Sequence, residues 1–535
     1  MTVQNCKICS AIAPCPRGKG VGVRVLNHNL FQSKGKKITM RKSGILMPIA
    51  SLPSEYGIGC FSKSAYDFAD WLKSAGQSYW QILPLCPTGF GDSPYQSFST
   101  FAGNPYFISL KELINQGLLT RKECDEIDFG AQDNKIDYEK QYKNRFSLLR
   151  RAYMRSDIEN NRDFTVFCHL NNYWLEDYSL FMALKDKFNN VSRTDFDTEY
   201  RLKDTDITNK IKDEPGDEIM FWKFVQFEFY RQWENLKTYA HKNNISIIGD
   251  MPIYVSSDSS DVWANPSLFE LDRTGTPLSV AGCPPDGFSQ NGQLWGNPLY
   301  NWEYHKKTKF EWWIKRIKHS FNLYDVVRID HFRGFDEYYS IKFGSENAKN
   351  GVWRKAPGNE LFKTVESALG KKDIIAEDLG FITDSVKKLL NDCQFPGMKI
   401  LQFAFDSRDS SNANEYIPHN YPFNSVAYTG THDNFTLVGW YKSISQAERK
   451  TVRDYLCDSY TPDSHIHKPL ISLILRSNSK LCIIPIQDWL GLDDNARINV
   501  PSTTGNNWCW RIKKEQLDSR TAKEIYKMTK LYSRL

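Results

Sequence analysis

Eight short runs of apolar, mostly β-branched residues recur along the chain from residue 44 onward. Strands that are buried on both faces read as near-continuous apolar runs, as in a parallel sheet covered by helices. Helical patterns separate several of the runs, for example at 65–74 and 312–321. This alternation predicts an α/β fold, with a (β/α)8 TIM barrel as the leading architecture. The runs lie at 44–48, 79–85, 245–250, 324–330, 372–378, 398–403, 425–433 and 480–486.

The spacing of these runs is uneven and predicts two insertions. The second run ends at residue 85 and the third begins at 245, and charged helical patterns fill the interval at about 111–240. A connection of that length needs structure of its own, so we expect an inserted helical subdomain. Residues at about 251–310 are rich in Pro, Gly, Asn and Trp and predict a loop-rich insertion. We therefore predict one barrel domain at 41–535, preceded by an N-terminal extension at 1–40.

Composition and charge narrow the choice of partners. Hydrophobic residues make up 41% of the chain and charged residues 25%, which is typical of a soluble globular protein. The net charge is +6, but residues 1–40 hold seven basic and no acidic residues, so that 62 basic and 63 acidic residues follow them. A balanced body gives no reason to expect nucleic acid as a partner. The apolar runs fall short of the roughly 18 residues of a membrane helix, so no membrane partner is expected.

The cysteines and the N-terminal extension carry no clear chemistry. The chain has 12 cysteines, mostly in apolar segments, and buried free thiols are the ordinary interpretation. Cys6 and Cys9 could form half of a zinc site, but no second pair follows, so we predict no metal. The first 40 residues lack a secretory hydrophobic segment and match a transit peptide only loosely. We expect a cytoplasmic location rather than a plastid one.

Polar residues gather where five of the predicted strands end. Barrel enzymes build their sites at the carboxyl ends of the strands, so these endings predict a site. The five endings are Asp250; Arg328 with Asp330; Glu377 with Asp378; His432 with Asp433; and Gln487 with Asp488.

The fourth predicted strand and the one after it place two carboxylates side by side. Residues i and i+2 of a strand share a face, so Arg328 and Asp330 point the same way, and we expect the guanidinium to lower the pKa of Asp330. An interior salt bridge is the structural alternative. Glu377 follows the apolar run at 374–376, which should raise its pKa and suit it to donate a proton. One ionised and one protonated carboxyl are typical of glycosidic-bond chemistry, and alternation alone does not choose Glu377 over Asp378.

A third carboxylate and two aromatic loops complete the candidate site. Asp433 follows His432 after the seventh run; such a pair can also bind a metal or cap a turn, but Arg328 would repel a cation. The loops at 92–107 and 281–302 combine aromatic rings with amide groups, which sugars need for stacking and hydrogen bonding. Aromatic side chains folded into the core are the alternative interpretation of each loop.

These stretches together closely resemble the 4-α-glucanotransferases, the amylomaltase or disproportionating-enzyme family of α-amylase-like barrels. The resemblance spans 43–511 in the order of the family, and the segment at 187–217 departs from it. It is carried by SGILMPIASLPSEYGIG (43–59), SPYQSFSTFAGNPYFISL (93–110), IIGDMPIYVSSDSSDVWANP (247–266), AGCPPDGFSQNGQLWGNPLYNW (281–302), VVRIDHFRGF (326–335), IIAEDLG (374–380), TGTHDN (429–434) and DNARINVPSTTGNNWCWR (494–511).

The resemblance implies a role for each matching residue. Asp330 looks like the nucleophile, Glu377 the general acid/base and Asp433 the transition-state stabiliser. It implies neither cofactor nor metal, and no C-terminal β-sandwich. The residues that match positions holding the sugar in the central subsite are Asp250, Arg328, His331 and His432, and those that match positions lining the glucan groove are Ser93, Tyr95, Gln293, Trp295 and Asn499.

From this resemblance we expect an enzyme that moves a segment of an α-1,4-glucan to the 4-hydroxyl of an acceptor. The expected partners are α-1,4-glucans and maltooligosaccharides, with glucose as an acceptor. The expected mechanism is a retaining double displacement through a covalent glucosyl-enzyme. An α-glucan hydrolase with the same carboxylates is one alternative, and a non-catalytic glucan-binding protein is another.

Overall fold

The structure is a computed structural model that describes residues 41–89, 91–130, 132–203, 216–285, 289–380, 382–407 and 414–535. The predicted extension at 1–40 lies outside the described residues, as do parts of both predicted insertions. The division of the chain into extension, barrel and insertions therefore stays a prediction. Among the described residues, no helix is both long and apolar enough to cross a membrane.

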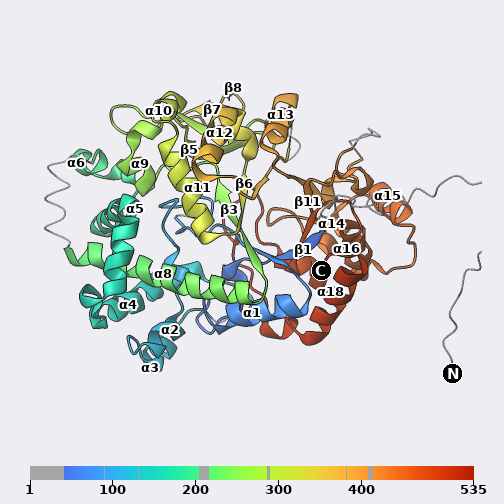
Figure 1. Cartoon of the computed structure of the whole chain (residues 1–535), viewed down its shortest axis with the longest axis horizontal. Coiled ribbons are helices and arrows are strands. Elements are labelled where there is room, and N and C mark those ends of the chain that lie inside the picture. The colour runs from blue at the N-terminus through green and yellow to red at the C-terminus, as the bar shows by residue number, and fades with distance from the viewer. Residues whose placement is uncertain are drawn as a thin grey trace, which may run out of the picture. The chain divides into compact units, whose positions relative to one another are not determined.

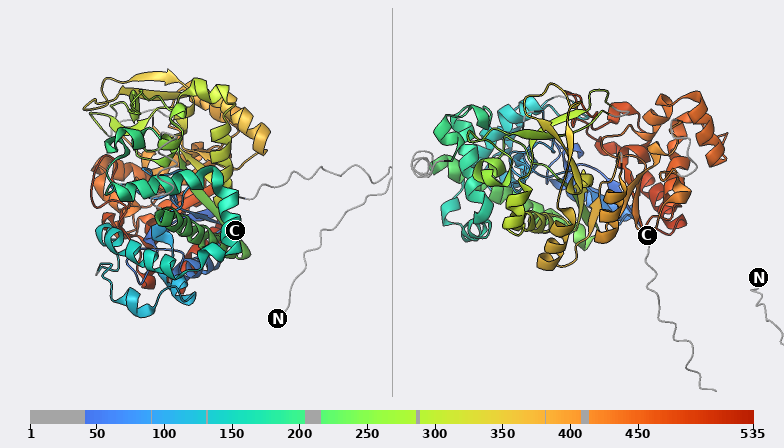
Figure 2. Two further views of the ribbon diagram at one scale, coloured as in Figure 1. Left: turned by 90° about the vertical axis from the view of Figure 1, so that its left-hand side faces the viewer. Right: turned by 90° about the horizontal axis from the view of Figure 1, so that it is seen from above.

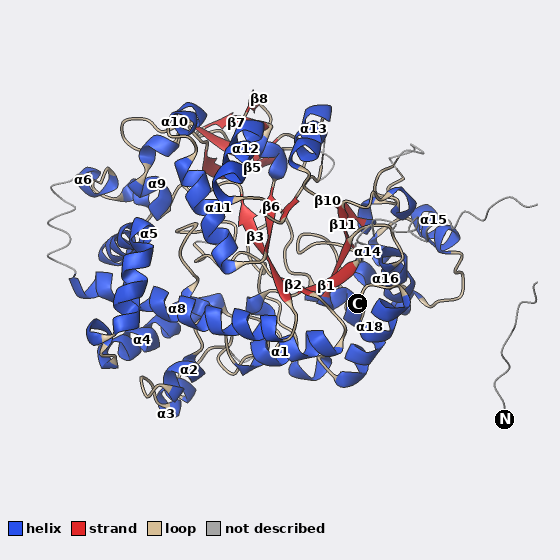
Figure 3. Ribbon diagram, viewed as in Figure 1, coloured by secondary structure: helices blue, strands red, loops and turns tan. Residues whose placement is uncertain are grey.

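Eight parallel strands form a closed barrel, which confirms the predicted fold class (Figure 3). Each predicted apolar run supplies one strand, and the strands follow one another around the barrel in chain order. Their central residues are buried because side chains fill the barrel interior and helices cover its outside. The strands are β1 (Lys42–Leu46), β2 (Tyr79–Gln81), β3 (Ser246–Pro252), β6 (Val326–Asp330), β9 (Ile374–Ala376), β10 (Gly397–Ile400), β11 (Ser425–Tyr428) and β12 (Leu481–Pro485).

Helices follow the strands and bury one apolar face against them (Figure 1). In the first helix, for example, Ala65, Phe68 and Leu72 recur at helical spacing and are fully buried. The two helical patterns expected at 65–74 and 312–321 correspond to α1 and α11. The helices after the strands are α1 (Lys63–Ser74), α11 (Glu311–Leu323), α12 (Gly358–Leu369), α13 (Asp384–Cys393), α14 (Leu437–Ser443), α15 (Gln446–Leu456), α16 (His467–Leu475), α17 (Ile486–Leu490) and α18 (Ser519–Leu531).

The described part of the 111–240 interval is helical. Its longest helix, α8, packs against α4 and α5 in its first half and runs directly into β3. In its second half Phe229 packs on Phe61, and the Trp233 indole donates a hydrogen bond to the Leu323 carbonyl at the end of α11. The segment therefore shares its core with the barrel. The helices are α2 (Leu110–Asn115), α3 (Arg121–Asp125), α4 (Tyr138–Arg155), α5 (Arg162–Lys187), α6 (Thr198–Arg201) and α8 (Gly216–Lys242).

A second sheet, which the sequence did not predict, lies in and after the loop-rich segment. It is antiparallel in the order β5-β4-β7-β8, from β4 (Ser279–Cys283), β5 (Gln293–Pro298), β7 (Glu337–Lys342) and β8 (Val352–Lys355). Short helices α9 (Ser260–Ala264) and α10 (Trp302–Lys307) flank its first two strands in the chain. The strands of this sheet, in yellow and green, lie at the top of Figure 1 and of the left-hand view of Figure 2. The loop that we predicted to contact sugar is thus partly a β-hairpin.

Candidate active site

A buried ion-pair cluster occupies the ends of the neighbouring strands β3 and β6. Asp250 and Arg328 are paired in the strand register, and Arg328 Nη1 lies 2.6 Å from Asp250 Oδ2 and 3.1 Å from Asp330 Oδ1. Arg328 and Asp330 therefore share a face, as alternation predicted. The Asp250 side chain is fully buried, whereas the Asp330 side chain keeps 29% of its surface exposed. Asp330 is thus the most accessible group of the cluster.

Two opposing effects act on the pKa of Asp330. Burial raises it well above the ordinary value, and the charge of Arg328 opposes that rise. Asp250, Glu377 and Asp433 raise it further because each adds negative charge nearby. The expectation that Arg328 would lower the pKa of Asp330 was therefore wrong for the net shift in the protein without substrate, although Arg328 acts in the expected direction.

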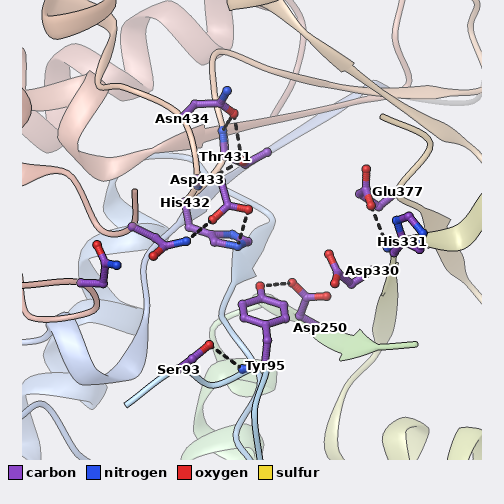
Figure 4. A network of polar contacts seen from close by, with 12 residues as sticks. Ser93, Tyr95, Asp250, Asp330, His331, Glu377, Thr431, His432, Asp433 and Asn434 are labelled. Atoms are coloured by element: carbon purple, nitrogen blue, oxygen red, sulfur yellow. Dashed lines mark hydrogen bonds and ion pairs between the residues drawn. The ribbon is translucent and has the colours of Figure 1, made fainter. Parts of the chain in front are cut away.

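Glu377 follows β9, the strand next to β6, and its carboxylate is fixed by two backbone amides. Glu377 Oε2 accepts a hydrogen bond from the His331 N–H at 2.7 Å, and Oε1 accepts one from the Leu379 N–H at 2.9 Å. Burial raises the pKa of Glu377, against the lowering effects of Arg328 and the two amides. This direction agrees with the prediction. In Figure 4 Glu377 and Asp330 lie next to each other.

Asp378, the alternative to Glu377, faces another direction. Its Oδ1 accepts a hydrogen bond from the Met398 N–H at 2.6 Å in β10. Its other oxygen lies where a side chain at Gly397 would stand, 2.2 Å from an ideal Cβ at that position. Burial raises the pKa of Asp378 to about 6. Asp378 therefore joins β9 to β10, and the geometry favours Glu377 as the group at the site.

His331 connects the ion-pair cluster to the second sheet. It adopts a left-handed backbone conformation, with φ of 51°, and this turns its N–H toward Glu377. Its ring meets the edge of Trp295 at a centroid distance of 4.8 Å, and the Trp295 indole donates a hydrogen bond to Gln293 Oε1 at 3.0 Å. Burial lowers the pKa of His331 to about 3, so its imidazole is neutral. The hairpin thus places Gln293 and Trp295 beside the cluster.

Tyr95 contacts residues at the carboxyl ends of both β3 and β11. We call the ring formed by the carboxyl ends of the barrel strands the strand rim. The Tyr95 hydroxyl donates a hydrogen bond to Asp250 Oδ2 at 2.8 Å, and its ring stacks on His432 at a centroid distance of 5.2 Å. Ser93 Oγ accepts a hydrogen bond from the Tyr95 N–H at 3.3 Å and so shapes the turn that carries it (Figure 4). Trp508 packs against both rings, at 5.8 Å from each. Burial lowers the pKa of His432, which favours its neutral form.

Asp433 lies opposite this cluster, after β11, and is held from a distant loop. Its Oδ1 accepts a hydrogen bond from Asn499 Nδ2 at 2.6 Å, and its Oδ2 lies 3.4 Å from His432 Nε2 (Figure 4). The Arg497 guanidinium donates to the carbonyls of Asp433, at 2.7 Å, and Asn499, at 2.8 Å. The Asp433 side chain is 42% exposed. Asn499, predicted to contact glucan, therefore contacts a predicted catalytic carboxylate directly.

Two residues of the site, Arg497 and Trp508, were not predicted from the sequence. Both residues lie within the stretch at 494–511 that carries the resemblance, which was the available signal. One of the five predicted polar strand ends is not part of the site. At the fifth polar ending, Asp488 is fully buried and accepts hydrogen bonds from the Thr429 hydroxyl and the Leu437 N–H. Burial raises its pKa to about 7. Asp488 therefore fixes the base of the β11 loop and does not reach the site.

The site brings together a buried cation, four carboxylates and aromatic rings at the carboxyl ends of parallel strands. A partly exposed carboxyl in contact with an arginine and a second carboxyl at the end of the neighbouring strand can supply a nucleophile and a proton donor. Among the described residues, no group of three or more His, Cys, Asp or Glu side chains is arranged to hold a metal ion. The fold and the site define a barrel enzyme that acts on glycosidic bonds.

Comparison with known proteins gives the family. A sequence model described as 4-alpha-glucanotransferase matches residues 47–517, and the chain belongs to this family. It is 48% identical to the 4-alpha-glucanotransferase of Clostridium butyricum over 91% of this chain and 100% of that one. It is 39% identical to the chloroplastic/amyloplastic 4-alpha-glucanotransferase of Solanum tuberosum, over 92% of this chain and 87% of that one. The structure of the amylomaltase from Streptococcus agalactiae in complex with acarbose superposes with a TM-score of 0.89 at 39% identity, covering 92% of this chain and 99% of that one. The chain is therefore a glycosyl-transferring enzyme that acts on α-glucans.

Proposed function

We propose that this 4-α-glucanotransferase works by a retaining double displacement in which Asp330 is the nucleophile and Glu377 the general acid/base. The supporting observation is their placement on neighbouring strands, with Arg328 in contact with Asp330 and two backbone amides on Glu377. Arg328 opposes the rise that burial causes in the pKa of Asp330, and burial raises the pKa of Glu377. Retention requires the two carboxyls to stand about 5 Å apart, close enough for direct attack.

In the first half-reaction an Asp330 oxygen attacks the anomeric carbon of an α-1,4-linked glucosyl unit. The bond from that carbon to the leaving 4-oxygen breaks, and Glu377 gives its proton to this oxygen. A glucosyl ester on Asp330 forms, and the reducing-end fragment leaves. Asp433 stabilises the oxocarbenium-like transition state because its negative charge lies where positive charge develops.

In the second half-reaction Glu377, now ionised, takes the proton from the 4-hydroxyl of an incoming acceptor. The acceptor oxygen attacks the anomeric carbon, and Asp330 leaves as a carboxylate. A second inversion restores the original configuration. Water gives hydrolysis in place of transfer, so the acceptor must occupy the groove and exclude it. All protons in both steps move between the substrate and Glu377.

The remaining predicted residues divide by their contacts. Asp250 and Tyr95 form a hydrogen-bonded pair beside Asp330 and suit the hydroxyls of the glucosyl unit that is transferred. Gln293 and Trp295 of the β4–β5 hairpin and Asn499 of the loop after α17 suit the glucosyl units on either side, since each offers an aromatic face or an amide. The residues assigned to sugar binding are Ser93, Tyr95, Asp250, Gln293, Trp295, Arg328, His331, His432 and Asn499.

The substrates that we propose are α-1,4-glucans and maltooligosaccharides, with glucose among the acceptors. The Streptococcus agalactiae amylomaltase has been solved with acarbose, an oligosaccharide analogue, which supports an oligosaccharide groove in this chain. We propose a cytoplasmic location. The Solanum tuberosum relative is named as chloroplastic/amyloplastic, so a plastid location is the alternative to test by imaging a tagged full-length chain.

Disproportionation of maltotriose tests the reaction and its nucleophile. The wild-type chain is expected to release glucose and to form oligomers longer than maltotriose, whereas Asp330→Asn is expected to do neither while keeping its circular dichroism spectrum. Shorter products alone would identify a hydrolase. A folded Asp330→Asn variant with wild-type glucose release would refute the nucleophile, and binding without any product from the wild type would identify a glucan-binding protein.

A further inference from the structure

A separate cavity of about 300 Å³ lies between α5, α9, α10 and α11. These four helices gather on one side of the molecule in Figure 1. The volume is at the lower end of the range of small-molecule sites. Asp330, Glu377 and Asp433 do not line it. It is therefore a hollow distinct from the candidate active site.

Aromatic rings form part of the wall of this cavity. Tyr173 and Tyr304 stand at its rim with 41% and 37% of their surfaces exposed, whereas Phe101 and Trp312 line it from buried positions. Trp312 is held by edge-on contacts with Phe101 and Phe269 at 6.4 Å. The hydroxyl of Tyr173 is hydrogen-bonded to the buried His319 ring at 2.9 Å. The rings of Tyr173 and Trp312 are therefore held in place by neighbouring side chains.

Two of the three carboxylates that line the cavity are paired with lysines. Glu311 pairs with Lys315 at 2.7 Å, and Asp177 pairs with Lys203 at 2.6 Å. The buried Asp261 accepts a hydrogen bond from the Thr100 N–H at 2.8 Å. This acidic lining disfavours an anionic ligand, and its carboxylate oxygens and the Lys315 ammonium group offer hydrogen bonds to a neutral one. A neutral ligand that is rich in hydroxyls and has a flat CH face matches this wall.

Two parts of the cavity wall belong to chain segments that also carry residues of the candidate active site. Ser99 and Phe101 belong to the loop that carries Tyr95, and the Ser260 N–H at the start of α9 donates to the Phe98 carbonyl. Tyr304 lies on α10, a few residues after the hairpin strand that carries Trp295. A glucan that occupies this cavity would therefore lie beside the segments that line the groove.

We propose that this cavity is a second carbohydrate site, which binds one or two glucosyl units of an α-glucan chain outside the active site. The inference rests on the proposed function for the choice of glucan. Its expected role is to hold long glucans near the active site, because a chain bound at two points dissociates less readily than a chain bound at one.

Equilibrium titration with maltotriose tests the site in a chain that cannot turn over. Asp330→Asn is the background, and Ser267→Trp fills the rim of the cavity with a large ring. We expect the double variant to bind one maltotriose fewer per chain than Asp330→Asn alone. Tyr304→Ala on the same background should raise the Kd of maltotriose for the second site about five- to tenfold, because one stacking ring is lost. Tyr526→Ala is the matched control because Tyr526 is 38% exposed on α18, and Tyr304 is 37% exposed.

Kinetics of the active enzyme supply the second readout. Ser267→Trp should leave glucose release from maltotriose unchanged and raise KM for amylose about five- to tenfold. Equal maltotriose stoichiometry with and without Ser267→Trp would overturn the second site. That failure is distinguishable from failure of the proposed function, because wild-type glucose release from maltotriose tests the function by itself.

Discussion

The two sides of the strand rim hold their carboxylates in different ways. On the β3–β6–β9 side, Arg328 and Asp250 are almost fully buried, and Asp330 and Glu377 are fixed by contacts between adjacent strand ends. On the β11 side, Asp433 is 42% exposed, and its side chain is held by Asn499, which lies 66 positions later in the chain. The first side is therefore set by the barrel itself, and the second by a loop docked onto it.

This difference follows the chemistry that each side is proposed to perform. A nucleophile and a proton donor need fixed separation and shifted pKa values, which buried strand ends supply. A stabilising carboxylate needs access to the sugar ring of the substrate and alignment with the positive charge that develops in the transition state. Removing a buried charge on the first side should therefore lower both stability and activity, whereas substitutions on the second side should affect catalysis alone.

Arg328→Met should have the largest effect. It removes the cation that both Asp250 and Asp330 contact, and an uncompensated buried carboxylate costs about 3–5 kcal/mol of unfolding free energy. Transfer activity should be lost as well, because the pKa of Asp330 rises further. Urea unfolding measures the first effect. Arg354→Met is the control, since its pair with Glu270 is 41% exposed at the arginine and should contribute no more than about 1 kcal/mol. Equal losses in the two variants would contradict the buried-cluster interpretation.

Glu377→Gln should reduce kcat/KM about 10²- to 10⁴-fold, the usual contribution of a general acid. Burial raises the pKa of Glu377, so it keeps its proton to a higher pH than an ordinary Glu, and kcat/KM should fall as pH rises through that raised value. In Glu377→Gln this alkaline decline should disappear.

Asp378→Asn is the control for Glu377→Gln. The pKa of Asp378 is raised to about 6, and an amide oxygen at this position can still accept the Met398 N–H. This variant should keep the alkaline decline and most of the activity. If the decline vanished in Asp378→Asn and remained in Glu377→Gln, the assignment of the two residues would be reversed.

Asn499→Ala should lower kcat about 10²-fold with an unfolding free energy close to wild type, because a misplaced catalytic group is costly even when the fold is intact. Asn499→Asp adds a specific readout. A carboxylate within hydrogen-bond distance of Asp433 removes the amide donor and adds a like charge, so kcat should fall at least as far as in Asn499→Ala. A large loss of stability in either variant would place Asn499 with the buried cluster and remove the contrast between the two sides.

The barrel was predictable because each of its strands is buried on both faces and reads as an apolar run. The second sheet was not, since β8 is exposed along its whole length and β5 contains Gly296 and Asn297 and has exposed residues at Leu294 and Gly296. Neither pattern differs from that of a loop. Likewise, Asp488 ends an apolar run as Asp250 does, but α17 begins at Ile486 and turns Asp488 toward the backbone at Leu437.

The candidate site likewise has a part that the local sequence pattern predicts and a part that depends on contacts between distant segments. Strand alternation alone placed Arg328 beside Asp330 and kept both Glu377 and Asp378 as candidates at the end of the next strand. It could not choose between them, because the choice depends on the Met398 amide and the space at Gly397 in another strand. The direction of the shift in the Asp330 pKa depends on burial. The hydrogen bonds from Asn499 and Arg497 to Asp433 depend on how the loop after α17 packs against the barrel. Neither is encoded in a local pattern of residues.

Arg497→Lys should give the smallest effect and the sharpest test of the loop-docked side. The Arg497 guanidinium donates to the carbonyls of Asp433 and Asn499 at once and lies over the Phe435 ring at 4.2 Å. A lysine keeps the charge but not the planar fork, so we expect kcat to fall about tenfold with KM and stability unchanged. Arg449→Lys is the matched control, because Arg449 also donates to a backbone carbonyl and lies over the Tyr441 ring. Equal kcat values in the two variants would mean that the Asp433 backbone needs no second support, and Asn499 alone would then hold the carboxylate.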